Sequence, residues 1–253
     1  KPEEYAALYY QQGADELIYQ DVVASLYGRN GLHEIISRTA RGIFIPLTVG
    51  GGIRTLEDIA AALRAGADKV SINTAVHEHP DFITKAVRKF GQSTVVVAIE
   101  AIRQPDGTSQ AFTDNGRNQT GREVVSWAVE AERLGAGEIL LTSVDREGTG
   151  SGLDIALIRQ VQAAIGIPLV VHGGVGRPND VLDLSVNLPV SGISVASMFH
   201  YHYISVNRQF DDFEGEGNIE FLKSGRKHSK IEPTSLTELK KMLHNNNVIC
   251  RMV

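Results

Sequence analysis

The chain alternates between short runs of apolar, β-branched residues and longer amphipathic stretches, and this alternation constrains the fold more than any other feature. Strands and helices that alternate in this order are typical of βαβ units around a parallel sheet. The seven runs that predict strands are 16–20, 45–49, 69–72, 94–99, 138–142, 168–171 and 192–195. The eight stretches that predict helices are 2–12, 31–39, 56–65, 80–90, 122–134, 155–164, 178–185 and 235–244.

Seven strands and eight helices, in a sequence that begins on a helix, predict an α/β protein of the TIM (β/α)8 barrel type whose first strand is missing from the sequence. The 253 residues fit such a barrel as a single domain, 1–253, whereas a flavodoxin-like or Rossmann sheet would need fewer units. We expect a polar, glycine- and charge-rich stretch, 203–233, to be an insertion before the last helix. Reacting residues in these barrels lie at the C-terminal ends of the strands, so we expect the functional site there.

The composition argues against several classes of partner. The formal net charge of -5 gives no basic surface for nucleic acid. The single cysteine, Cys250, excludes an internal disulfide framework and a cysteine-built zinc site, and it suits a reducing compartment, so we expect a cytoplasmic protein. No apolar run is long enough to predict a membrane span, and no His-Glu-x-x-His pattern predicts a metal site.

A weak internal repeat supports the barrel. Residues 13–16, 66–69 and 135–138 each combine a glycine that ends a helix with a charged residue that begins a strand. These charges would lie at the N-terminal mouth of the barrel, where they either meet as a polar ring on the axis or remain as solvated strand ends. The three residues are Glu16, Lys69 and Glu138.

Two glycine clusters, 48–54 and 171–176, follow predicted strands. Glycines at the ends of strands allow backbone N–H groups to approach an anion closely, and the next helix adds a favourable dipole. Each cluster is followed by a polar strand end in the next unit, 71–74 and 196–197 respectively, so the pattern predicts two phosphate-binding cups half a barrel apart. Neither cluster fits a Walker loop or a dinucleotide fingerprint, which argues against nucleotide triphosphates as ligands.

Three carboxylates follow predicted strands: Asp21, Glu100 and Asp145. An acid at the end of an apolar strand is partly desolvated, which raises its pKa and suits it to proton transfer. The alternative is that each acid caps a helix or pairs with a nearby cation such as Arg103 or Arg146.

Three stretches, 48–53, 66–75 and 135–143, resemble the cyclase of imidazole glycerol phosphate synthase, and the likeness runs from residue 2 to about residue 202 and returns at 236–251. The resemblance implies an enzyme of histidine biosynthesis. It further implies that a glutaminase of the class I amidotransferase kind, as a subunit or a fused domain at the N-terminal face, would supply ammonia to the barrel. The ammonia would attack a bisphosphorylated aminoimidazole carboxamide ribonucleotide in its phosphoribulosyl-formimino form. Cyclisation and cleavage would then yield imidazole glycerol phosphate and aminoimidazole carboxamide ribonucleotide, and the resemblance implies no cofactor.

The resemblance also implies roles for particular residues. One phosphate site would consist of Gly52, Asn73 and Thr74, and the other of Gly174, Ala196 and Ser197. Substrate contacts would be made by Asp21, Thr142 and Asp145, and the gate through which ammonia enters would consist of Glu16, Lys69 and Glu138.

The catalytic pair departs from the family pattern. The family uses an aspartate on the first strand, which the sequence lacks, and a second aspartate where this chain has Glu100. A glutamate keeps the carboxylate but moves it by one methylene, and a displacement of a catalytic group by about 1 Å can lower the rate on the order of 100-fold. One alternative to the cyclase is therefore a catalytically weakened barrel that binds a phosphorylated ligand or the glutaminase. A second is the sister phosphoribosyl-formimino isomerase, which also uses a bisphosphorylated substrate and paired carboxylates but needs no ammonia.

Overall fold

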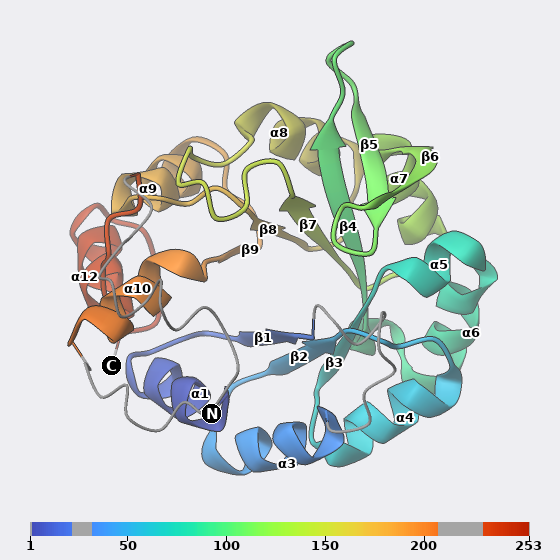
Figure 1. Ribbon diagram of the computed structural model, residues 1–253, viewed down its shortest axis with the longest axis horizontal. Helices are drawn as coiled ribbons and strands as arrows, with labels where there is room; N and C mark the ends of the chain where they lie inside the picture. Colours follow the sequence, from blue (N-terminus) through green and yellow to red (C-terminus); the bar gives the residue numbers. More distant parts are fainter. Residues whose placement is uncertain (1, 22–31, 207–229, 253) are drawn as a thin grey trace.

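A computed structural model of the protein describes residues 2–21, 32–206 and 230–252. Seven parallel strands curve around a central axis, and helices cover their outer side (Figure 1). The hydrogen-bonded order is β1-β2-β3-β4-β7-β8-β9, so within the described residues the ring of strands is nearly closed between β1 and β9. The strands are β1 (Leu17–Gln20), β2 (Leu47–Gly50), β3 (Lys69–Ile72), β4 (Val95–Arg103), β7 (Glu138–Ser143), β8 (Leu169–His172) and β9 (Gly192–Ser194).

This arrangement is a TIM barrel, and each of the seven predicted strands and eight predicted helices is present. The predicted helices correspond to α1 (Pro2–Gln11), α3 (Leu32–Gly42), α4 (Leu56–Ala65), α6 (Asp81–Phe90), α7 (Val124–Arg133), α8 (Ile155–Ala164), α9 (Pro178–Asn187) and α12 (Leu236–Asn245). Within the described residues, two further α-helices, α5 (Thr74–Glu78) and α10 (Ser197–Val206), escaped prediction, since α5 is a single turn and α10 lacks a clear polar face. None of the described helices has the length and apolarity needed to cross a membrane.

An antiparallel hairpin, which the sequence pattern does not predict, interrupts the alternation of strands and helices after β4. β4 continues beyond its predicted end to Arg103 and pairs with β5 (Ser109–Thr113), which pairs in turn with β6 (Asn118–Glu123). The hairpin rises beside β4 at one end of the barrel (Figure 1). The helix predicted from residue 122 begins two residues later, because Glu123 belongs to β6 and its side chain caps α7.

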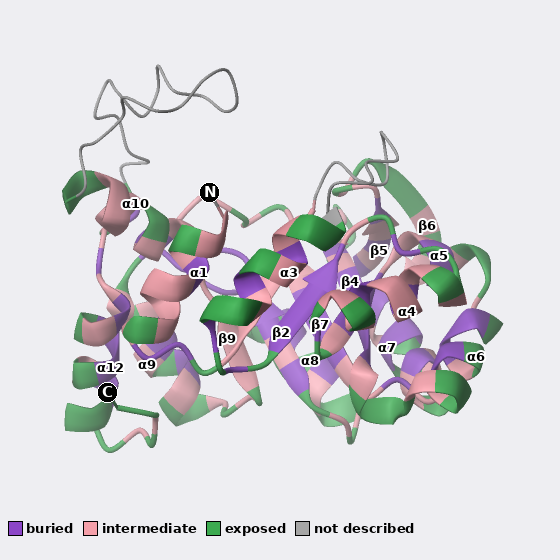
Figure 2. Cartoon of the chain, turned by 90° about the horizontal axis from the view of Figure 1, so that it is seen from below, coloured by how far each residue is buried: buried purple, intermediate pink, exposed green. Residues whose placement is uncertain are grey.

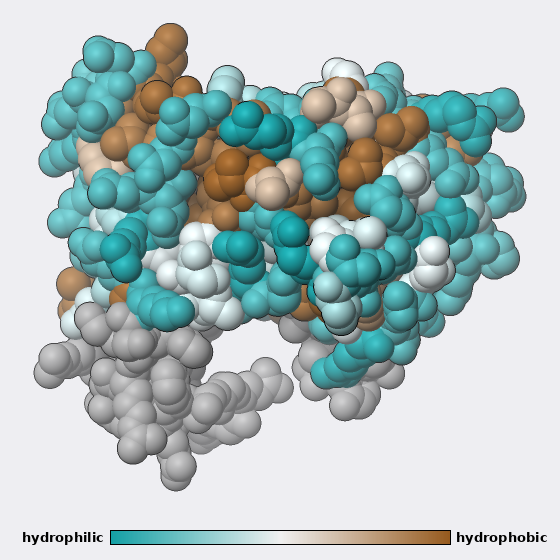
Figure 3. Space-filling view, turned by 90° about the horizontal axis from the view of Figure 1, so that it is seen from above, coloured by the Kyte–Doolittle hydropathy of each residue, from teal (hydrophilic) through white to brown (hydrophobic). Residues whose placement is uncertain are grey.

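The core lies between the strands and the helices. Fully buried side chains such as Val49, Val95 and Ile139 point outward from the strands, whereas their neighbours in sequence point to the axis. Figure 2 shows buried strands inside a shell of helices with exposed outer faces, and the face in Figure 3 is largely hydrophilic with smaller hydrophobic groups.

The repeated glycines end their helices as predicted. Gly13, Gly66 and Gly135 have φ values of 91°, 118° and 107°, a left-handed conformation that costs glycine little. At Gly66 the backbone N–H donates to two carbonyls of the last turn of α4. Each glycine therefore turns the chain into the next strand at the same end of the barrel.

The last helix, α12, returns to the N-terminal end of the barrel. The buried Lys240 on this helix donates from Nζ to both carboxylate oxygens of Asp15, each at 2.8 Å. The predicted insertion 203–233 lies mostly outside the described residues, and its first four residues form the end of α10.

The Lys240–Asp15 pair gives a prediction for stability. Asp15→Ala leaves a buried ammonium without its partner and should lower the free energy of unfolding by about 1–3 kcal/mol. Lys240→Met removes the charge and keeps the apolar stem, so Asp15→Ala added to Lys240→Met should cost far less. Urea unfolding of the four proteins in a double-mutant cycle measures both effects. If Asp15→Ala lowered the free energy of unfolding equally in the unaltered protein and in Lys240→Met, the two residues would not be energetically coupled.

Candidate active site

Polar side chains from four consecutive strands lie side by side at the C-terminal end of the barrel. Glu100 on β4 pairs in register with Thr142 on β7, which pairs with His172 on β8, which pairs with Ser194 on β9. Residues paired across neighbouring strands point to the same face of a sheet. Thr142 Oγ1 and His172 Nδ1 are 3.5 Å apart. The pairing therefore places a row of polar groups along the inner rim, where a barrel enzyme binds its substrate.

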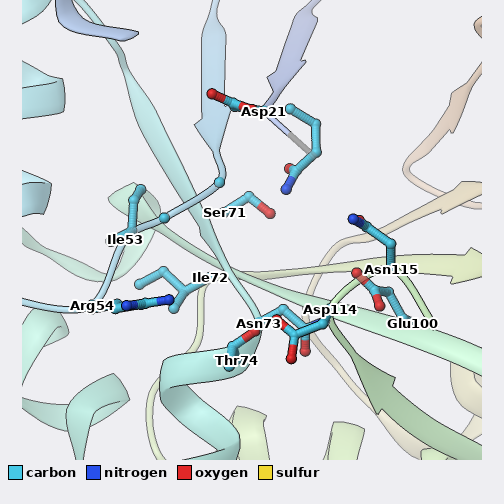
Figure 4. A pocket seen from close by; sticks show the side chains of 13 residues that line it. Asp21, Ile53, Arg54, Ser71, Ile72, Asn73, Thr74, Glu100, Asp114 and Asn115 are labelled. Atoms are coloured by element: carbon cyan, nitrogen blue, oxygen red, sulfur yellow. The ribbon is translucent and has the colours of Figure 1, made fainter. Parts of the chain in front are cut away.

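A pocket opens at the C-terminal ends of β1 to β4 (Figure 4). Its lining residues are Gln20, Asp21, Gly51, Gly52, Ile53, Arg54, Ser71, Ile72, Asn73, Thr74, Glu100, Asp114 and Asn115. It thus brings the first predicted phosphate set, Gly52, Asn73 and Thr74, together with Asp21 and Glu100. These residues come from separate parts of the sequence. The sequence predicted no role for Gln20, Asp114 or Asn115, and it included Arg54 only as the last residue of the glycine cluster 48–54. Among these residues, only the Asn-Gly pair at 115–116 carried a recognisable turn signal.

Two polar atoms of residues that line the pocket are free to accept or donate a hydrogen bond. Ser71 Oγ and Asn73 Oδ1 are buried side-chain atoms without a hydrogen-bond partner among the described residues. Such atoms are rare in folded proteins and are satisfied by water or a ligand. Gly51 closes the wall with φ 104°, and a Cβ there would lie 2.3 Å from the Asp21 carbonyl oxygen, so only glycine fits.

Glu100 is the carboxylate best placed for proton transfer. Burial raises its pKa above the ordinary value of 4.5, and the nearby carboxylates of Glu147 and Asp114 act in the same direction. Oε2 accepts a hydrogen bond from the Gly116 backbone N–H at 2.8 Å, which with the Asn73 side chain partly offsets that rise. The Glu100 carboxyl is therefore held in one position, and its pKa is raised in the direction of neutral pH, as general acid–base chemistry requires.

The second predicted phosphate set lies past the ends of β8 and β9. His172 on β8 pairs with Ser194 on β9. Gly174 lies two residues after His172, Ala196 lies two residues after Ser194, and Ser197 begins α10. Gly174 has φ 102°, and a Cβ there would lie 2.2 Å from the Gly152 carbonyl oxygen. The glycine is thus required by close backbone packing, and its phosphate-binding role stays a prediction.

Asp145 lies in the turn after β7. Arg103 donates to both oxygens of Asp154, at 2.8 and 2.7 Å, and this pair raises the pKa of the Arg103 guanidinium. Asp145 adds a smaller contribution in the same direction. The structure therefore places Asp145 near a cation, one of the two alternatives that the sequence left open, while its contact with substrate stays a prediction.

The three charges at the opposite end of the barrel meet in its interior. Lys69 Nζ lies 3.0 Å from Glu16 Oε2 and 2.9 Å from Glu138 Oε2. Glu16 also accepts from Thr48 Oγ1 at 2.7 Å. Because β3 is not a sheet neighbour of β1 or β7, these side chains must cross the interior to meet. They form a polar ring across the axis rather than solvated strand ends.

The ring should stabilise the fold through Lys69. The two glutamates raise the pKa of Lys69, so its contribution is complete below the ordinary lysine value near 10.4 and is lost as the pH rises through the raised value. At pH 7, Lys69→Met should lower the free energy of unfolding by about 1–3 kcal/mol, because two partly buried carboxylates lose their counter-charge. Urea unfolding is the measurement. Lys85→Met, which removes an exposed i,i+4 pair with Asp81, is the control and should cost at most about 0.5 kcal/mol; equal losses would contradict a special role for the ring.

Comparison with known proteins agrees with this geometry. Residues 1–205 match the family described as histidine biosynthesis protein. The imidazole glycerol phosphate synthase subunit HisF of Legionella pneumophila is 55% identical over 176 residues, which cover 70% of this chain and 83% of that relative. The same-named subunits of Symbiobacterium thermophilum and Alkaliphilus metalliredigens are 45% and 43% identical, over 79% and 82% of this chain and 78% and 82% of their own lengths. The chain therefore belongs to the histidine biosynthesis protein family and is a relative of the imidazole glycerol phosphate synthase subunit HisF.

Proposed function

We propose that the protein is the cyclase of imidazole glycerol phosphate synthase. It uses ammonia to convert the phosphoribulosyl-formimino form of a bisphosphorylated aminoimidazole carboxamide ribonucleotide into imidazole glycerol phosphate and aminoimidazole carboxamide ribonucleotide. The observation that carries the proposal is the pairing of two charged sites at opposite ends of one barrel. Glu100 lies in a polar pocket at the C-terminal end, and Lys69 lies between two glutamates at the N-terminal end.

The upper site supplies the groups that a bisphosphate and a proton transfer require. Gly52, Asn73 and Thr74 line the pocket and would bind one phosphate, and Gly174, Ala196 and Ser197, which follow β8 and β9, would bind the other. Glu100 and Thr142 lie side by side on the rim between these two sets. A substrate with a phosphate at each end would therefore lie across the rim, with its central part over Glu100.

The lower ring supplies a barrier that ammonia would have to pass. Lys69 joins Glu16 and Glu138 across the barrel interior, so its side chain would have to move before ammonia could enter from below. Ion pairs that are only partly buried can open at modest cost, since water solvates the separated charges. The sister isomerase needs no ammonia, and the ring thus favours the cyclase.

A glutaminase subunit would dock around this entrance. The loop between α3 and β2 lies at the N-terminal end of the barrel and carries Phe44, whose surface is 83% exposed. Phe44 stacks edge-on against Tyr10 and lines a surface depression that also includes Pro46 and Asp68. A large exposed aromatic side chain beside a depression is typical of a protein interface.

The direct test is turnover of the phosphoribulosyl-formimino substrate with ammonium chloride as the nitrogen source. Free ammonia removes any dependence on the glutaminase. Formation of both products at an enzyme-like rate supports the cyclase. Substrate binding without products would instead identify a weakened barrel, and conversion of the phosphoribosyl-formimino precursor would identify the isomerase.

Glu100 gives the corresponding kinetic prediction. Glu100→Gln keeps the size of the side chain but cannot accept a proton, so kcat with ammonium chloride should fall by about 10²–10⁴-fold. In the unaltered protein, burial raises the Glu100 pKa, so kcat/KM should decline with falling pH at a value above the ordinary 4.5. That acid limb should be absent from the pH profile of Glu100→Gln. A profile that is unchanged by the substitution would assign the proton transfer to another group.

Phe44 gives the prediction for the partner surface. Phe44→Ser should lower glutamine-dependent turnover in the presence of the glutaminase and leave ammonium-dependent turnover unchanged. Val129→Ser, which alters a 42% exposed residue on α7, is the control and should affect neither. Equal glutamine-dependent rates for the two variants would place the partner on another surface.

A further inference from the structure

We propose that the turn of the β5–β6 hairpin, residues 114–116, positions the Glu100 carboxylate and brings a second carboxylate, that of Asp114, to the same pocket. This inference rests on the proposed role of Glu100 in proton transfer. Asp114 and Gly116 are then positioning residues, since they act on the reaction through Glu100.

The hairpin holds the pocket at two points. The Gly116 N–H donates to Glu100 Oε2 at 2.8 Å, and the carbonyl of Phe112 accepts from Asn73 Nδ2 at 3.1 Å. Phe112 is also the strand partner of Glu100. The hairpin therefore fixes a catalytic carboxylate and a predicted phosphate-binding amide together, although it adds no strand to the barrel itself.

The turn keeps an unusual backbone conformation. Asp114, Asn115 and Gly116 have φ values of 54°, 60° and 75°, three left-handed residues in succession. Such conformations are sparsely populated, persist where the surroundings determine them, and cluster at active sites. At Gly116 a Cβ would lie 2.7 Å from Val144 Cγ1 and 3.2 Å from Ile102 Cδ1, so the turn packs against β4 and the β7 loop with no room for a side chain.

Asp114 completes the charged surroundings of Glu100. Its side chain lines the pocket (Figure 4). It also accepts a hydrogen bond from Asn118 on β6. The other charged groups near Glu100 are Glu147 from the loop after β7, and Asp21 and Arg54 across the pocket; His172 lies two strands away. Burial is the main reason for the raised pKa of Glu100, and the carboxylates of Glu147 and Asp114 raise it further.

The two parts of the turn therefore have opposite electrostatic effects. The Gly116 N–H favours the ionised carboxylate and fixes its direction, whereas the charge of Asp114 favours the protonated form. Together they would keep Glu100 ready to exchange a proton with the substrate while its position stays constant. If the turn had a merely structural role, substitutions in it would change neither the titration of Glu100 nor the rate of the chemical step.

Asp114→Asn tests the electrostatic part. It removes the charge and keeps the shape, so the pKa of Glu100 should fall, and the acid limb of kcat/KM should move to lower pH. The pKa can be followed by side-chain carboxyl NMR of protein with ¹³C-labelled glutamate, in which the Glu100 signal is the one absent from Glu100→Gln. Asp106→Asn, an exposed change in the β4–β5 turn, is the matched control and should leave the pKa of Glu100 unchanged.

Gly116→Ala tests the positioning part, with Gly121→Ala as its control. Both glycines lie in the hairpin with nearly equal φ values of 75° and 74°, but a Cβ at Gly121 meets open space. Both substitutions carry the backbone strain, which thermal unfolding measures, whereas only Gly116→Ala should lower kcat with ammonium chloride, by about 10- to 100-fold.

The proposal is overturned if Asp114→Asn leaves the Glu100 titration unchanged, or if Gly116→Ala and Gly121→Ala have equal kcat. Failure of the proposed function gives a different pattern. The unaltered protein would then form no product with ammonium chloride, while the NMR titration of Glu100 would still respond to Asp114→Asn.

Discussion

The parallel hydrogen bonding of seven strands is the constraint on which the rest of the structure depends. Because every strand runs in the same direction, all seven C-terminal ends meet at one end of the barrel and all N-terminal ends at the other. The chain can therefore form two polar sites at opposite ends of the barrel, joined by the barrel interior. Glu100 and Lys69 belong to different sites because Glu100 lies near the C-terminal end of the part of β4 that pairs with β7, whereas Lys69 begins β3.

Register then decides which residues meet within each site. Glu100, Thr142 and His172 lie far apart in sequence, yet successive pairs across β4, β7 and β8 place them in one row. The lower ring follows from the same geometry, since closure of the sheet brings residues of non-neighbouring strands into contact. Lys69 satisfies two carboxylates there, so the ring is neutralised in part and its burial costs less than three separate charges would.

The sequence was sufficient for the barrel but not for the details of either site. The strands of the barrel are short apolar runs and its helices are amphipathic stretches, so each can be predicted from its local pattern of hydrophobic residues. Glycines such as Gly66 mark the turns between them. Whether Lys69 was solvated or paired could not be decided, because the answer depends on the curvature of the whole sheet. The hairpin escaped prediction because residues 104–122 are mostly polar and lack the alternation of a half-buried strand, so only Asn115-Gly116 marked its turn.

The hairpin also bears on the glutamate at position 100, where the resemblance implies an aspartate. A longer side chain has one more rotatable bond, and at an exposed strand end its carboxylate would sample several positions. Here the Gly116 N–H selects one of them, and burial limits the others. The backbone donor thus compensates for the flexibility of the extra methylene, since a hydrogen bond to a charged group is among the stronger of such bonds. A carboxylate displaced by one methylene but fixed in direction is compatible with proton transfer, provided that the substrate settles against it.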